Sequence, residues 1–265
     1  MVSFVNLLVA GLLASVAIAI PHQAHSAFHH KRGSTKRGAA YNDASLIPLV
    51  SNSGNVPWAY NWWSSANGKM PSGVEYVAML WGPKAFGTWT NDIEKSLSSG
   101  CKHILGFNEP DEASQSNLSP ADAVNYHKQY MLPYQGRASL GSPGVTNGAN
   151  GMGLDWLTSF LNLCGGSCGL SFVAIHWYAE ASLVDYFKQH VTQAIQLANA
   201  HNIPEVWITE FGGIGDATAQ ATFLKQVIPW LESQSAVTHY AYFMVGQDIL
   251  VNSNSLTPLG SIYVS

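Results

Sequence analysis

The chain has 265 residues, of which 11% are charged and 11% are aromatic, including nine Trp and eleven Tyr. This length suits one large domain, and the composition excludes both an intrinsically disordered chain and a nucleic-acid binder with a basic surface. Low charge together with many aromatic side chains is typical of proteins that stack on neutral ligands such as sugars, although the same aromatics would equally fill a core.

The N-terminal segment indicates secretion. Residues 1–19 are largely apolar and end in Ala17-Ile18-Ala19, a small-x-small cleavage pattern, and a polar His-rich sequence follows them directly. These features predict a signal peptide over residues 1–19 rather than a membrane anchor, and therefore a protein that is extracellular or in the cell wall. Every later apolar run is too short to span a bilayer.

Two dibasic pairs follow, Lys31-Arg32 and Lys36-Arg37, in a stretch rich in Ser, Gly and His that has no hydrophobic period. Such pairs are cleavage sites for processing proteases of the secretory pathway, so we predict a propeptide over residues 20–37 and a mature start near Gly38. The alternative is an uncleaved basic tail. Removing residues 1–37 takes away four of the twelve Lys and Arg, which leaves eight against sixteen Asp and Glu, a net charge of −8. This acidity argues against nucleic acid and anionic membranes as partners.

Three cysteines are present. Cys164 and Cys168 enclose Gly-Gly-Ser, whose glycines allow a tight reversal, so in a secreted chain we predict a disulfide between them. Cys101 precedes an apolar run and is predicted to be a buried free thiol. The Cys-x3-Cys spacing lacks the nearby pair of His that a zinc site would need, and we expect no metal and no cofactor.

Eight short apolar, β-branched or aromatic runs alternate with helix-like segments along the chain. They are Ala39–Asn42, Val56–Trp62, Glu75–Trp81, His103–Glu109, Ala138–Val145, Phe172–Tyr178, Glu205–Phe211 and Val237–Met244. The later runs begin about every thirty residues, the size of one strand-plus-helix unit, which predicts parallel strands. Eight such units predict an α/β fold, a (β/α)8 TIM barrel over residues 38–265. The early units are short and are expected to be truncated. An open doubly wound sheet is the alternative, but the Gly-rich phosphate loop that it would need does not follow the early runs.

Three of the intervening helices have recognisable start signals. Ser119 is followed by Pro120 and then by an acid three residues after the cap. Ser182 and Asp216 are predicted to begin two later helices in the same way.

Two acids, Glu109 and Glu210, stand at the C-terminal ends of the fourth and seventh runs, where barrels of this type hold their catalytic groups. Either acid alone would more simply be a surface ion-pair partner or a helix cap. Glycosidic hydrolysis, however, requires two carboxyl groups: a protonated one that donates to the leaving oxygen and an ionised one that attacks the anomeric carbon. The pair therefore predicts a glycoside hydrolase. Its stereochemistry depends on the distance between the acids, which the sequence does not contain.

The segments around these acids also carry a family resemblance. Ile104–Asp111 is ILGFNEPD, Phe172–Tyr178 is FVAIHWY and Trp207–Gly212 is WITEFG. This combination resembles glycoside hydrolase family 128, and the resemblance extends over residues 38–265. The family comprises (β/α)8 endo-β-1,3-glucanases that retain anomeric configuration. The resemblance therefore implies a retaining endo-β-1,3-glucanase whose partner is the β-glucan of fungal walls or its oligosaccharides.

The resemblance implies roles for single residues. Glu109 would be the acid/base, Glu210 the nucleophile, and Asn108 a donor to the sugar 2-hydroxyl. Tyr178 is a candidate hydrogen-bond donor to Glu210. His176 lies two residues before Tyr178, on the same face of the strand, and is a further candidate for the site.

Aromatic and amide side chains supply the other candidate substrate-binding residues. Trp62, Trp63 and Trp81 are candidate platforms for sugar faces, and Asn61 precedes two of them. Tyr242 stands where the family usually has Trp, so we expect it under the reacting sugar with less stacking area.

Two other functions are compatible with the sequence. A cell-wall protein of the same fold could bind β-glucan without hydrolysing it, and a hydrolase could act on a β-1,4 or β-1,6 linkage, because cleft shape determines linkage. The presence of both carboxylates and Asn108 favours an enzyme. We expect a monomer with no nucleic-acid or membrane partner.

Overall fold

A computed structural model describes residues 36–265. The predicted signal peptide, the first dibasic pair and most of the predicted propeptide lie outside the described residues. Within the described part, the main sheet has the order β3-β2-β1-β9-β8-β7-β6-β5-β4, and all its strand pairs are parallel. Its strands are β1 (Arg37–Tyr41), β2 (Trp58–Tyr60), β3 (Glu75–Tyr76), β4 (Ala78–Met79), β5 (His103–Leu105), β6 (Ser139–Val145), β7 (Leu170–Glu180), β8 (Glu205–Ile214) and β9 (Val237–Val245).

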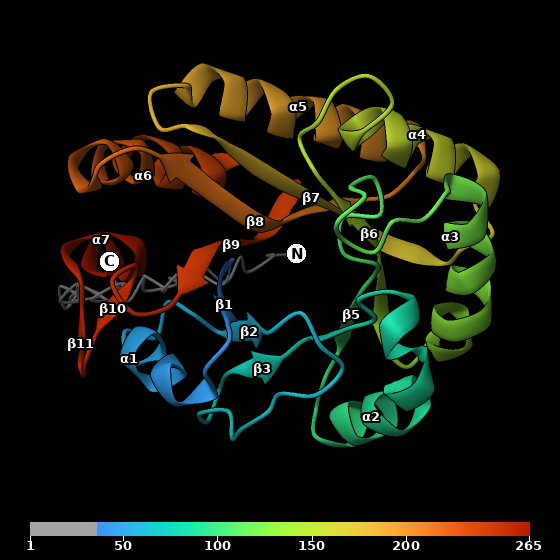
Figure 1. Ribbon diagram of the computed structural model, residues 1–265, viewed down its shortest axis with the longest axis horizontal. Helices are drawn as coiled ribbons and strands as arrows, with labels where there is room; N and C mark the ends of the chain where they lie inside the picture. Colours follow the sequence, from blue (N-terminus) through green and yellow to red (C-terminus); the bar gives the residue numbers. More distant parts are fainter. Residues whose placement is uncertain (1–35) are drawn as a thin grey trace, which may run out of the picture. The chain divides into compact units, whose positions relative to one another are not determined.

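The nine strands correspond to the eight predicted runs, because the third run is divided at Val77 into β3 and β4. Strand β3 pairs with β2, and β4 pairs with β5, so this one run joins the two ends of the sheet. The result is the predicted TIM-like α/β barrel, nearly closed, with helices outside the ring of strands (Figure 1).

The helices are α1 (Ile47–Ser51), α2 (Phe86–Ser98), α3 (Pro120–Tyr126), α4 (Gly153–Cys164), α5 (Val184–Ala200), α6 (Ala217–Ser233) and α7 (Pro258–Val264). A two-stranded hairpin, β10 (Val251–Asn252) and β11 (Ser255–Leu256), precedes α7. The early units are truncated as predicted: α1 has five residues, and the segment 61–74 between β2 and β3 contains no helix.

Two of the three predicted helix starts are confirmed. The Ser119 hydroxyl accepts from the amide of Asp122, and the Asp216 carboxylate accepts from the amide of Ala219. The prediction for Ser182 was wrong. The Leu183 amide donates to Glu180 O in a turn, so Leu183 rather than Ser182 stands at the N-cap of α5, without a side-chain cap.

Alternation along the strands gives the barrel two packed layers. The side chains inside the ring form one buried cluster, which comprises Ala40, Trp58, Tyr60, Val77, Met79, Leu105, Phe172, Trp207 and Ala241. Within it, the Trp207 ring stacks on Phe172 at 4.1 Å between centroids. The intervening strand residues face outward and pack against the helices in a larger cluster. The barrel interior is therefore filled with packed side chains below the C-terminal ends of the strands.

The cysteines have the predicted states. Cys164, at the end of α4, forms a disulfide with Cys168 in the turn before β7, and Cys101 is a buried free thiol. Among residues 36–265, the helices are all too short or too polar to cross a bilayer.

Candidate active site

Glu109 and Glu210 face one cleft at the C-terminal end of the barrel. Glu109 lies four residues beyond β5, and Glu210 lies within β8, so the two acids belong to the fourth and seventh runs as predicted. The cleft has a volume of about 440 Å³ and is lined by Asn42, Trp62, Trp81, Asn108, Glu109, Gln115, Tyr178, Glu210 and Phe243. One oxygen of Glu109 and one of Glu210 lie within 4.8 Å of each other.

The backbone at Glu109 is held in an uncommon conformation. Its φ is +41°, in the left-handed region that residues other than glycine seldom adopt. Its amide donates to Gly144 O at 2.7 Å, which ties the residue to β6. Conformations of this kind cost free energy and are concentrated at functional sites.

The buried His176 side chain lies close to both acids. Its Nδ1 lies 2.8 Å from Glu109 Oε1 and 3.6 Å from Glu210 Oε1, and its Nε2 lies 2.9 Å from Thr209 Oγ1. The side chain is fully buried, so it supports the site without lining the cleft. Burial lowers the pKa of His176, but the charge of Glu210 and the charge and hydrogen bond of Glu109 raise it by more. The net effect places the pKa of His176 above its ordinary 6.5.

Each carboxylate oxygen of Glu210 has its own donor. Trp62 Nε1 donates to Oε1 and the Tyr178 hydroxyl donates to Oε2, both at 2.6 Å. The predicted bond between Tyr178 and Glu210 is therefore present. Burial and the charge of Glu210 raise the pKa of Tyr178, so its hydroxyl keeps its proton. Two donors stabilise negative charge on Glu210 and fix its orientation.

Asn108 is buried at the edge of the cleft. Its Nδ2 donates to Gln115 Oε1 at 3.2 Å, while its Oδ1 has no hydrogen-bond partner among the described residues. A buried polar atom without a partner is costly, so this amide is suited to a ligand that fills its capacity.

Trp81 lines the cleft, and a cation occupies one face of its ring. Lys84 Nζ lies 3.1 Å from the ring centroid, a cation–π contact that restricts the indole. Trp63 lies outside the cleft and packs against the outer core.

Like Trp63 and His176, the predicted substrate-binding residues Asn61 and Tyr242 do not line the cleft. Asn61 is buried in the loop after β2, where its Nδ2 donates to Ser65 O and its Oδ1 accepts from the Tyr76 hydroxyl. Tyr242 faces outward from β9 and donates to Gln220 Oε1 in α6. Adjacent strand residues point to opposite faces, so Phe243 lines the cleft in its place.

Three cleft residues were missed by the sequence interpretation: Asn42, Gln115 and Phe243. Asn42 directly follows β1, and Phe243 has the inward parity of Ala241, so both had a usable signal. Gln115 lies in the irregular segment between β5 and α3, where no periodicity marks an inward side chain.

The oxygens of Glu109 and Glu210 and a nitrogen of His176 are also close enough together to hold a metal ion. The arrangement does not fit that role well, because both ring nitrogens already have hydrogen-bond partners. The raised pKa of His176 also favours the protonated ring, which has no lone pair for a metal. The contacts instead describe two carboxylates that are each held by hydrogen bonds to other side chains: Glu109 by His176, and Glu210 by Trp62 and Tyr178.

Comparison with known proteins gives one family and several solved structures. The family model described as "Glycosyl hydrolase catalytic core" matches residues 38–263. A GH128 subgroup III curdlan-specific exo-β-1,3-glucanase from Blastomyces gilchristii, solved with glucose, is 46% identical, with a TM-score of 0.85 over 88% of this chain and 99% of that one. A GH128 subgroup II endo-β-1,3-glucanase from Sorangium cellulosum is 26% identical, with a TM-score of 0.72 over 87% of this chain and 98% of that one. A GH128 subgroup I endo-β-1,3-glucanase from Amycolatopsis mediterranei is 25% identical, with a TM-score of 0.73 over 87% and 99% of the two chains. No curated protein matches the chain in sequence.

Proposed function

Because the chain belongs to the glycosyl hydrolase catalytic core family and, within it, to glycoside hydrolase family 128, we propose that it hydrolyses β-1,3-glucan with retention of configuration. The observation that carries retention is that one carboxylate oxygen of Glu109 and one of Glu210 lie within 4.8 Å of each other. Retaining enzymes hold their carboxyl groups ~5 to 5.5 Å apart, whereas inverting enzymes hold them ~6.5 to 9.5 Å apart to admit a water. The closer spacing favours direct attack by a carboxylate.

The contacts assign one role to each acid. Glu210, with a donor on each oxygen, attacks the anomeric carbon as a carboxylate, while Glu109 gives its proton to the departing glycosidic oxygen. The product of this step is a glycosyl ester of Glu210. Glu109 then takes a proton from water, the water oxygen attacks the anomeric carbon, and the ester bond to Glu210 breaks. Two inversions at one carbon restore the original configuration.

His176 and Asn108 support this sequence without exchanging covalent bonds. His176 lies between the two acids and attracts whichever carries negative charge, first Glu210 and then Glu109. Asn108 is next to Glu109, and its Oδ1, which lacks a hydrogen-bond partner within residues 36–265, is placed to accept from a sugar hydroxyl. Hydrogen bonds to the 2-hydroxyl strengthen in the oxocarbenium-like transition state.

We propose that cleavage proceeds from chain ends. The solved enzyme that is 46% identical is described as a curdlan-specific exo-β-1,3-glucanase, and this similarity supports the exo mode. The endo mode expected from the family resemblance is the alternative. The motifs behind that expectation surround Glu109 and Glu210, where the chemistry is the same in either mode, whereas the mode depends on how the outer cleft ends.

Hydrolysis of curdlan, laminarin, lichenan and pustulan tests the linkage and the mode together. We expect cleavage of the β-1,3 polymers. NMR should detect β-anomers as the first products, and small products should be released while the viscosity of the polymer solution falls slowly. A rapid fall in viscosity with long initial products would establish endo action, and α-anomers would contradict retention. Hydrolysis confined to pustulan would assign a different linkage.

Substitution of the acids tests the mechanism. Glu109→Gln is expected to lower kcat by roughly 10²- to 10⁴-fold, the usual contribution of general acid–base catalysis. Glu210→Gln is expected to lower it at least as much. Full activity in both variants would reject the mechanism. Binding of β-glucan without release of reducing ends by the unsubstituted protein would identify a wall-binding protein instead.

A further inference from the structure

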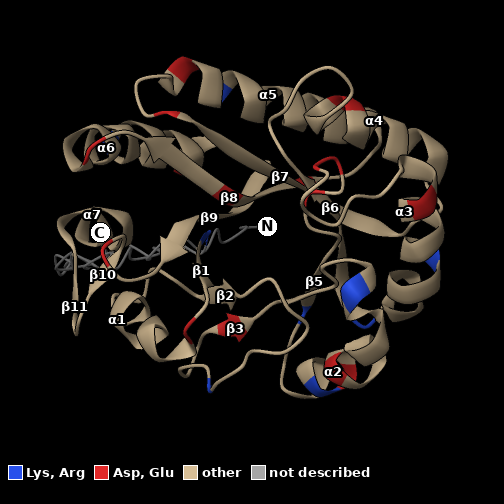
Figure 2. Cartoon of the chain, viewed as in Figure 1, with Lys and Arg blue, Asp and Glu red and all other residues tan. Residues whose placement is uncertain are grey.

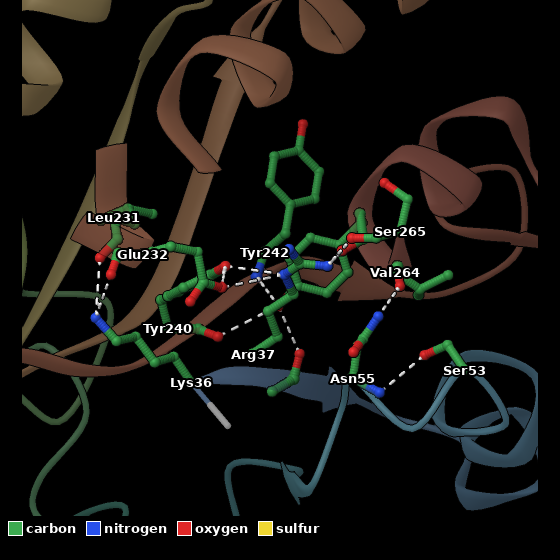
Figure 3. Close-up of polar contacts among 12 residues, drawn as sticks. Lys36, Arg37, Ser53, Asn55, Leu231, Glu232, Tyr240, Tyr242, Val264 and Ser265 are labelled. Atoms are coloured by element: carbon green, nitrogen blue, oxygen red, sulfur yellow. Dashed lines mark hydrogen bonds and ion pairs between the residues drawn. The ribbon is translucent and has the colours of Figure 1, made fainter. Parts of the chain in front are cut away.

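The second dibasic pair is part of the folded barrel. Lys36 Nζ donates to three carbonyl oxygens at the C-terminal end of α6, those of Leu231, Glu232 and Gln234, at 3.2, 3.0 and 2.8 Å. The last carbonyls of a helix have no partner within the helix and form the negative end of its dipole. The Lys36 ammonium therefore caps α6 (Figure 3).

Arg37 connects the first strand to the C-terminal elements. Its guanidinium is buried, donates to the Tyr240 hydroxyl at 2.9 Å and lies 3.4 Å from Glu232 Oε1. It also donates to the carbonyl oxygen of Tyr263, in α7. A further bond goes to the carbonyl oxygen of Ser265, which Figure 3 labels. Because the Glu232 side chain is 30% exposed, loss of Arg37 is expected to cost mainly its hydrogen bonds to Tyr240, Tyr263 and Ser265.

The backbone atoms of Lys36 and Arg37 also take part in the hydrogen bonding of the folded barrel. Lys36 O accepts from the Tyr240 amide at 2.8 Å and from Trp58 Nε1 at 3.0 Å. The Arg37–Gly38 peptide bond lies inside β1, which pairs with β2 on one side and β9 on the other. A protease binds its substrate as a free extended segment, which a strand paired on both edges cannot offer. A cut here would also place a charged amine at Gly38, which is buried.

We propose that Lys36 and Arg37 are retained in the mature protein, where they hold β1 against α6, β9 and α7; we call this pair the clamp. Processing hydrolyses the Arg32–Gly33 bond instead. Lys31-Arg32 presents the same two consecutive basic residues to a processing protease. The mature chain then starts at Gly33 rather than at Gly38, the start predicted from the sequence. The cleavage part of this proposal rests on the expected entry into the secretory pathway.

The mature N-terminus is tested by intact mass and N-terminal sequencing of the full chain secreted from a host with a dibasic-specific protease. We expect a start at Gly33 in the unsubstituted protein and in Arg37→Ala, and loss of that start in Arg32→Ala. A start at Gly38 would overturn the proposal. A start at residue 20 would overturn its cleavage part.

The clamp is tested with chains that begin at Gly33, Lys36 and Gly38. The first two are expected to melt at the same temperature, and the third roughly 3 to 12 °C lower because it lacks the hydrogen bonds of Arg37 and the α6 cap. Failure of the Gly38 chain alone to fold supports the clamp. Equal melting temperatures for all three chains would reject it. Lys36→Ala and Arg37→Ala in the Gly33 chain then apportion the loss between the two side chains.

Discussion

At the scale of single residues, the site is defined by the hydrogen bonds of Glu210. Tyr178→Phe removes the donor to Oε2 while keeping the ring against Phe243. We expect kcat to fall by roughly 10- to 100-fold, the value of one charge-assisted hydrogen bond, with little change in melting temperature. Steady-state kinetics on laminarin measures this. Tyr126→Phe in α3, whose ring packs against Phe86 and the outer core, is the matched control and should retain full activity.

His176 makes stability depend on pH in a defined direction. Although burial lowers its pKa, Glu210, Glu109 and Asp111 together raise it above 6.5. A pKa raised by folding stabilises the protein fully below the unfolded value, and this contribution is lost as pH rises through the folded pKa. The melting-temperature advantage of the unsubstituted protein over His176→Asn should therefore be larger at about pH 6 than at about pH 9. An advantage that stays constant or grows with pH would contradict the placement of a cationic His176 between the acids.

At the scale of elements, the strands were predictable because both faces of a parallel barrel are buried, so each strand is a nearly continuous apolar run. Their ends were not, because hydrogen bonding decides where a strand stops. Strand β7 continues to Glu180 and β8 to Ile214, beyond the runs that predicted them. The division of the third run into β3 and β4 depends on which neighbour each half meets, and a single run contains no such information.

The same contrast between local sequence pattern and tertiary contacts explains which site residues could be predicted. Glu109 and Glu210 could be placed because each is the first acid at the end of an apolar run. Tyr178 could be placed because alternation from the inward-facing Phe172 turns it toward the cleft. Tyr242 was assigned to the site because it stands where the family usually has Trp. Alternation along β9 from the inward-facing Ala241 instead directs Phe243 toward the cleft. His176 was on the correct strand face, but its position behind both acids depends on packing against Gly144 and Thr209.

Gly144 in β6 provides the space that His176 occupies. A Cβ at this position would lie 2.9 Å from His176 Nε2, so Gly144→Ala should displace the ring, lower the melting temperature and reduce kcat. Gly87 in α2 is the matched control, because a Cβ there meets nothing within 4 Å. Gly87→Ala should leave kcat unchanged and stabilise the protein by roughly 0.4 to 1 kcal/mol. Thermal melts and laminarin kinetics on both variants measure these effects, and an active Gly144→Ala enzyme would contradict the packing argument.

At the scale of the whole molecule, the barrel is acidic and sparsely charged. Only two of the twelve Lys and Arg, and none of the sixteen Asp and Glu, precede residue 36, so residues 36–265 carry ten positive against sixteen negative groups, a net charge of −6. Figure 2 shows few Lys and Arg, and Asp and Glu scattered over helices, loops and the strands β3 and β8. The cleft itself contains the carboxylates of Glu109 and Glu210 among aromatic and amide side chains. This charge distribution is compatible with a neutral polysaccharide and repels a polyanion.

The substrate's charge should therefore determine the response to salt. On neutral laminarin, kcat/KM should change less than about twofold between about 20 and about 300 mM NaCl, because screening acts only on interactions between charges. On a carboxymethylated β-1,3-glucan of similar length, kcat/KM should be lower at about 20 mM NaCl and should rise as salt screens the repulsion. The comparison holds the linkage constant and varies only the charge of the polymer. A strong salt dependence on laminarin, or a preference for the carboxymethylated chain at low salt, would show that a cationic surface guides the substrate, contrary to the acidic balance of the barrel.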